Sequence, residues 1–187
     1  MSIVDANYRF IAAAQEANAR IAQRQQSLAL YVTIVLSLLA ALVALGNGHA
    51  GSVSRAAWLL LGFPLASLCL VFLNYKSEAA LTNLRSFLSE LEQLGNAHER
   101  LPSFNTDARW TLAANKARKF HDIASAVLAA GAHSIGIAVV NTAPVAGSET
   151  LMLSAVTAAA GVAVTIALLI VPRWVASVCA ARLLDTG

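Results

Sequence analysis

Four long stretches of the chain are almost wholly apolar and contain no Asp, Glu, Lys or Arg, and polar segments separate them. These stretches are 28–45, 56–73, 123–145 and 151–171. Each is close to the roughly 20 residues that a helix needs to cross about 30 Å of hydrocarbon. A charge at the centre of a spanning helix costs about 2.5–3.5 kcal/mol on insertion scales. The pattern therefore predicts an all-α integral membrane protein with four transmembrane helices.

Apolar residues also recur at helical spacing within the polar segments. Segment 1–27 predicts an amphipathic helix that runs into the first span. Its apolar positions are Ile3, Phe10, Ala14, Ala17 and Ile21, followed by Leu28. Segment 74–122 predicts a helical hairpin broken by Pro102, with a heptad-like leucine seam in its first helix. The seam and the apolar face of the second helix consist of Leu81, Leu84, Phe87, Leu88, Leu91, Leu94, Trp110 and Phe120. We expect a helical stalk whose apolar faces pack against each other or against another subunit.

The distribution of basic residues predicts the orientation. All but one of the 13 Lys and Arg residues lie in three polar segments, and the exception is Arg55. The three segments are 1–27, 74–122 and 172–187. The positive-inside rule places them in the cytoplasm, with both termini, at a plasma (inner) membrane. The connections 46–55 and 146–150 then face outward, and they are too short to form a ligand-binding domain.

Composition agrees with the membrane interpretation. Apolar residues make up 58% of the chain and charged residues 12%. Soluble domains average about 45–50% and about 25%. The first apolar stretch follows a polar and amphipathic segment, 1–27, which does not resemble a cleavable signal peptide. Two isolated cysteines, Cys69 and Cys179, predict neither a disulfide nor a metal site, and we expect no cofactor.

The two halves of the chain have the same order of elements. Residues 1–95 read as helix, span, span and helix, and residues 104–187 repeat this order with a shorter tail. Both units have the same orientation, so a repeat would be parallel rather than inverted. The sequence identity between the halves is slight.

A few polar or helix-breaking residues inside the spans are candidates for a site. His133 and Ser134 lie near the middle of the third span, and an ionisable group at that depth is a functional candidate by default. The alternative is a neutral histidine that hydrogen-bonds to a neighbouring helix. Asn141, nearer the outer end, bonds between helices or reaches interfacial water. Pro64 is expected to kink the second helix and free a backbone carbonyl.

Basic residues gather at the inner ends of the first and third spans. They are Arg20, Arg24, Lys116, Arg118 and Lys119. Each can gain about 1 kcal/mol from an anionic leaflet, so membrane lipids are the expected partners. An anionic ligand held by this collar is the alternative. Nucleic acid is not expected, because acidic residues are interleaved with the basic ones.

No catalytic motif is present, neither a phosphate-binding loop nor a metal or nucleophile signature, so we do not expect an enzyme. The general design, helical cytoplasmic extensions on short transmembrane hairpins, is similar to small bacterial membrane proteins that act as effectors or sensors in phage defence. No motif supports that likeness. The leading hypothesis is a homo-oligomeric scaffold, sensor or gated pore. The alternatives are a small ion or proton channel or transporter that uses His133, and an adaptor that recruits a soluble cytoplasmic protein.

Overall fold

The structure is a computed structural model that describes residues 6–46, 57–94, 104–105, 107–142 and 148–185; side chains are not described for 6, 46, 108–118, 173 and 175–185. The described residues are almost entirely helical and contain no strand. The elements are α1 (Ala6–Gly46), the 3-10 turn η1 (Leu59–Leu61), α3 (Gly62–Gln93), α5 (Ala108–Asn141) and α6 (Ser148–Asp185). All four α-helices are long and apolar enough to cross a membrane, so the prediction of four such helices in an all-α chain is confirmed.

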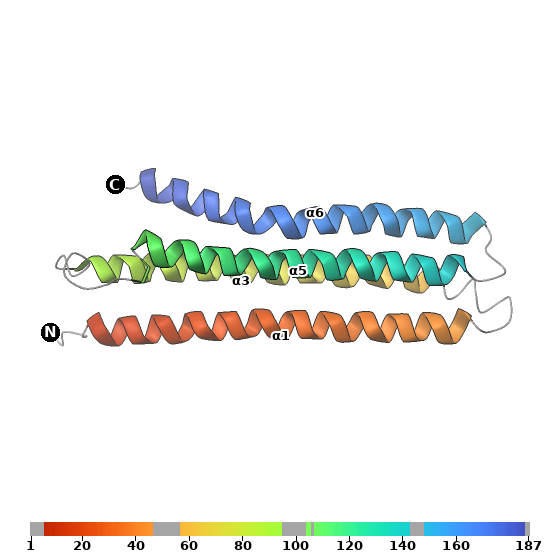
Figure 1. The fold of residues 1–187 in the computed structure, drawn as a ribbon, viewed down its shortest axis with the longest axis horizontal. Helices are drawn as coiled ribbons and strands as arrows, with labels where there is room; N and C mark the ends of the chain where they lie inside the picture. The colour runs from red at the N-terminus through yellow and green to blue at the C-terminus, as the bar shows by residue number, and fades with distance from the viewer. Residues whose placement is uncertain (1–5, 47–56, 95–103, 106, 143–147, 186–187) are drawn as a thin grey trace.

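The four helices lie side by side in one elongated bundle (Figure 1). α1 and α5 run in one direction, and α3 and α6 run in the other. Residues 6 and 185 therefore lie at the same end as the connection between α3 and α5, and we call this the terminal end. α1 packs on α3, α3 on α6 and α6 on α5, while α1 meets α5 along a shorter stretch. Corresponding helices of the two halves are thus parallel neighbours.

Each helix continues past its charge-free stretch at the terminal end. α1 begins at Ala6, far ahead of the stretch that starts at residue 28. α3 ends at Gln93, far beyond the stretch that stops at residue 73. At about 1.5 Å per residue, these extensions are roughly 30 Å long. A continuous helix therefore joins each apolar stretch to its polar extension.

Two prolines mark irregular points in the helices. Pro64 lies in the first turn of α3, directly after the 3-10 turn Leu59–Leu61. The missing N–H is harmless in a first turn, so Pro64 does not have to break α3, and the kink expected at this residue stays a prediction. Pro172 directly follows the fourth charge-free stretch and lies inside α6, which continues beyond it. Figure 1 shows α6 diverging from the other helices toward Asp185.

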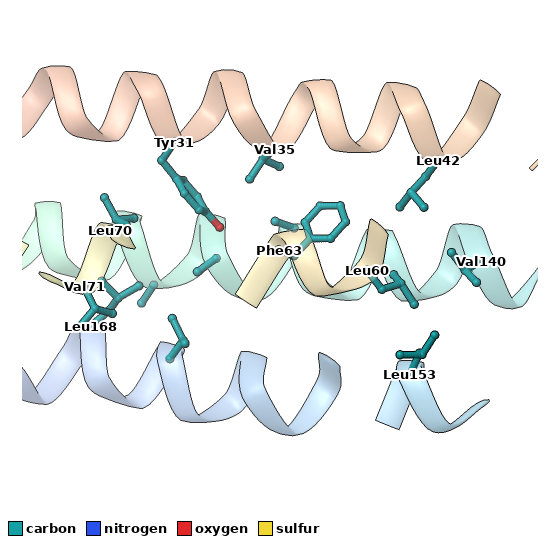
Figure 2. Packing of buried hydrophobic residues seen from close by; sticks show 14 of the residues in the cluster. Tyr31, Val35, Leu42, Leu60, Phe63, Leu70, Val71, Val140, Leu153 and Leu168 are labelled. Carbon is teal, nitrogen blue, oxygen red and sulfur yellow. The ribbon is translucent and has the colours of Figure 1, made fainter. Parts of the chain in front are cut away.

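The core is a column of interlocking apolar side chains drawn from all four helices (Figure 2). From α1, Tyr31, Val35 and Leu42 point inward at spacings of four and seven residues. They meet Leu60 and Phe63 near the start of α3. The outer surface is apolar as well, since only 17–39% of the most apolar window of each helix is buried. Helices that are apolar on every side are typical of membrane spans.

The predicted stalk seam is only partly buried. Leu81 and Leu88 are buried within the chain, and Leu84 and Leu91 are half-buried. Phe87, Leu94 and Phe120 are exposed, as is Ile21 of the predicted N-terminal stripe. The side chain of Trp110 lies outside the described residues. The seam therefore packs inside the chain along one edge and leaves its other edge uncovered.

Candidate functional site

A buried ion cluster joins three helices at the point where their charge-free stretches begin or end. Arg24 of α1 lies between Glu78 of α3 and Asp122 of α5. Its Nη1 donates to Glu78 Oε2 at 3.3 Å, and its Nη2 donates to Asp122 Oδ1. Arg24 is 5% exposed and Glu78 is fully buried. We call these three residues the ion cluster.

The position of the ion cluster follows from the register of the helices. Arg24 lies one turn before residue 28, Glu78 just over one turn after residue 73, and Asp122 directly before residue 123. Burying charges costs several kcal/mol per ion, and good geometry with an opposite charge offsets this cost. Here the two terminal nitrogens of the Arg24 guanidinium each donate to a different carboxylate. The cluster therefore requires all three helices to be in place.

Two further basic groups lie close to the cluster and outside the charge-free stretches. Burial lowers the pKa of Arg85, and the charge of Arg24 lowers it further. Burial also lowers the pKa of His121; Arg24 adds to this effect and Asp122 opposes it. His121 is therefore neutral near pH 7, which avoids a third positive charge at this level.

A second polar contact lies farther along the interior. The hydroxyl groups of Tyr31 on α1 and Ser67 on α3 are 2.9 Å apart and buried. Figure 2 shows the Tyr31 ring pointing from α1 into the bundle. Between this pair and the ion cluster lies Asn74, one turn from Glu78 on α3 and also buried.

His133 lies in the interior, near the middle of the charge-free stretch 123–145 on α5, and is 3% exposed. Its Nδ1 is 2.7 Å from the carbonyl oxygen of Ala129 in the same helix. The ring packs at 6.3 Å from the Phe63 ring, measured between centroids, and against Gly161 of α6. An added Cβ at Gly161 would lie 2.8 Å from His133 Cγ. The expected hydrogen bond to a neighbouring helix is therefore replaced by one within α5, and Gly161 makes room for the ring.

Polar groups continue toward the other end of the bundle. Ser154 of α6 donates to Asn141 Oδ1 of α5 at 3.1 Å, which is the interhelical alternative for Asn141. Thr157 and Thr150 of α6 are buried as well. Ser134, by contrast, lies on the outer face of α5.

Several buried polar atoms have no hydrogen-bond partner among the described residues. They are Arg24 Nε, Asn74 Oδ1, His121 Nε2, His133 Nε2 and Thr157 Oγ1. Buried polar groups without a partner are rare in folded proteins, and each one needs a physical explanation. These atoms belong to the ion cluster, to His121 beside it, or to the buried polar residues farther along the bundle.

Two cavities open between pairs of neighbouring helices. One of about 350 Å³ lies between α1 and α3 and is almost wholly apolar, with Gly62, Ala66 and Cys69 among its lining residues. The other, of about 280 Å³, lies between α5 and α6 and is lined in part by His133 and Ser134. Within the described part of the chain, no group of His, Cys, Asp or Glu could hold a metal ion.

Searches with protein-family models, curated proteins and solved structures found no match.

The structure separates the residues of the predicted basic collar. Arg24 is buried in the ion cluster rather than facing lipid, and Arg20 forms an exposed ion pair with Glu16. Lys119 is exposed, while the side chains of Lys116 and Arg118 are outside the described residues. The ion cluster was not among the sites predicted from the sequence. One signal for it is present in the sequence: Glu78 and Asp122 flank the charge-free stretches of α3 and α5, just as Arg24 flanks that of α1.

Proposed function

We propose that this protein is a non-enzymatic, homo-oligomeric membrane protein of the plasma (inner) membrane, with both termini in the cytoplasm. The bundle is embedded in the bilayer, and the helical extension at the terminal end assembles with further copies of the chain. In this role the protein is a scaffold or sensor whose state of assembly depends on the cytoplasmic extension.

The observation that supports this proposal is a group of exposed apolar side chains far from the charge-free stretches. Tyr8 is 70% exposed and Leu94 is 55% exposed, and Ile11 and Phe87 are exposed as well. Phe87 lies well beyond residue 73 on α3, and Tyr8 lies well before residue 28 on α1. A helix rises about 1.5 Å per residue, so both side chains lie roughly 20–30 Å outside the hydrocarbon, where lipid tails cannot cover them.

Tyr8 and Ile11 lie on α1, Phe87 lies on α3 and Leu94 directly follows α3; these two helices pack on each other. Apolar side chains that gather on a surface facing water are typical of protein–protein contacts. A second copy of the chain presents the same apolar residues, so two copies can cover these residues with each other, as in a two-fold symmetric interface. Recruitment of a soluble partner is the competing use of this surface. Such a partner would bind the leucine seam between Leu81 and Leu94, and the burial of Leu81 and Leu88 within the chain leaves less of that seam available.

The test is the oligomeric mass in lipid nanodiscs, measured by mass photometry or native mass spectrometry. We expect the wild type to be an oligomer and the triple variant Tyr8→Ser, Ile11→Ser and Phe87→Ser to shift toward the monomer. Gln15→Ser and Glu90→Ser change exposed polar residues on the same two helices and should leave the mass unchanged. A wild type that is strictly monomeric at every concentration would overturn the proposal.

A further inference from the structure

Polar groups follow the interior of the bundle over most of its apolar length. On α5, the series begins at the partly buried Asp122, passes through the buried Ser125 and His133, and ends at Asn141, which is exposed at the other end of the bundle. At about 1.5 Å per residue, its two ends are about 28 Å apart along the helix. That is close to the roughly 30 Å thickness of a hydrocarbon core. The neighbouring helices add Asn74, Ser67 and Thr157 to the same interior.

Some hydrogen-bonding groups in this interior have no partner among the described side chains and backbone. Asn74 Oδ1, His133 Nε2 and Thr157 Oγ1 lie at successive depths and have no partner among the described residues. Leaving such a group unsatisfied costs about 1–3 kcal/mol. Internal water is the usual partner of such groups, provided that two to four polar atoms converge on it. A file of water molecules along the interior would supply the partners that these atoms lack.

The hydrogen bond of His133 fixes which of its nitrogens can take up a proton. A carbonyl oxygen only accepts, so Nδ1 carries the hydrogen that it donates to Ala129. In the neutral ring, Nε2 then holds the free lone pair, and it is buried without a partner among the described residues. A proton can bind at Nε2 and leave from Nε2 while the bond to Ala129 remains intact.

We propose that the interior of each bundle conducts protons between the two ends of the apolar stretches, with His133 as the protonation site at mid-depth. The carboxylates of the ion cluster collect or release the proton at the terminal end. Asn74 and the Tyr31–Ser67 pair hold water between the cluster and His133. Thr157 and the Ser154–Asn141 pair hold it on the other side. Each transfer moves one proton from an oxygen of water to His133 Nε2, or back again.

One apolar segment interrupts the series and sets the rate. Asn74 and Ser67 are about two turns apart on α3, or roughly 10 Å. Leu70 and Val71 lie between them on this helix, and Leu70 is almost completely buried in the core (Figure 2). Leu70 therefore acts as a dry gate, and the ring of Phe63 beside His133 narrows the next step. A water file can form through such a constriction when side chains move, whereas a hydrated metal ion cannot pass.

The test is proton flux into vesicles of phosphatidylethanolamine and phosphatidylglycerol that hold a pH-sensitive dye, driven by a potassium diffusion potential with valinomycin. We expect Leu70→Ala to raise the flux above that of the wild type by about tenfold, because the smaller side chain admits water to the gate. Adding His133→Leu to Leu70→Ala should remove that gain, because the protonation site is lost. His133→Gln in the same background serves as a second variant that keeps a polar side chain. Ile135→Ala, on the exposed face of α5, is the matched control and should change nothing.

The oligomeric mass and thermal midpoint of each variant show that it is folded before its flux is compared. The proposal is overturned if Leu70→Ala carries no flux above that of protein-free vesicles. It is equally overturned if that flux persists when His133 is replaced, or if potassium passes as readily as protons. The path lies within one bundle and does not depend on assembly, so the mass and flux experiments can fail independently.

Discussion

At the scale of single residues, Arg24 is the side chain that joins three helices through ion pairs. It contacts an acidic residue on each of two other helices and is almost completely buried. Its neighbour Arg20, one turn earlier, forms an exposed ion pair within α1. Both arginines belong to the basic group predicted at the inner end of the first span, but Arg20 is exposed and Arg24 is buried.

We predict that Arg24→Met destabilises the protein by about 3–5 kcal/mol, because it removes the positive charge that pairs with both Glu78 and Asp122. Combining it with Glu78→Gln and Asp122→Asn should recover much of this loss, since no net charge then remains to be buried. Arg20→Met should cost only about 0.2–1 kcal/mol, as is usual for an exposed pair. Reversible unfolding in detergent micelles measures all three. Equal losses for Arg24 and Arg20 would show that the buried pairing contributes no more than a surface pair.

At the scale of helices, the sequence predicted four long apolar helices but not which face each of them buries. The stretches free of charge predicted helices long and apolar enough to cross a membrane, and the structure confirms four such helices. The interior face of α1 carries Ala13, Arg24, Tyr31 and Val35. The predicted stripe instead included Ile21, which is exposed. Inner and outer faces of a span are equally apolar, so hydrophobic periodicity is a weak guide there, and the burial of Arg24 depends on partners from α3 and α5.

Small residues in α5 and α6 provide a prediction at this scale. Gly161→Ala should destabilise the bundle by about 1–3 kcal/mol, because its Cβ would meet the root of the rigid His133 ring. Gly131→Ala should instead stabilise it by about 0.5–1 kcal/mol, since no atom lies within 4 Å of the added Cβ and alanine favours the helix. Thermal midpoints of the two variants should therefore move in opposite directions. A rise for both would mean that the His133 ring is free to shift.

At the scale of the whole molecule, the order of helices around the bundle was beyond the reach of the sequence. The chain predicts two helical hairpins of like orientation, and the structure packs them so that α1 lies along α5 and α3 along α6. α3 and α5, which are consecutive in the chain, lie diagonally and touch less than neighbouring helices do. This order depends on how Phe63, Leu70 and the buried polar groups interlock. No one-dimensional pattern contains that information.

The orientation of the whole molecule gives a further prediction. With Cys69 and Cys179 replaced by serine, a cysteine at Ser54 should react with a membrane-impermeant maleimide added to intact spheroplasts. A cysteine at Gln15, which is exposed on α1, should react only after lysis. The positive-inside distribution of Lys and Arg is the physical reason. The reverse labelling pattern would place both termini outside the cell and exclude the proposed topology.

The ion cluster also has a consequence for biosynthesis. Asp122 is translated long after Arg24, when α1 and α3 are already made. Until then, the nascent hairpin holds an arginine whose second carboxylate partner has not yet emerged from the ribosome. Arrival of α5 supplies the second carboxylate acceptor of Arg24 and links the two hairpins in the same step. A chain that stops before α5 therefore lacks the acceptor for Nη2 of Arg24, and with it the ion pair that joins α1 to the second hairpin.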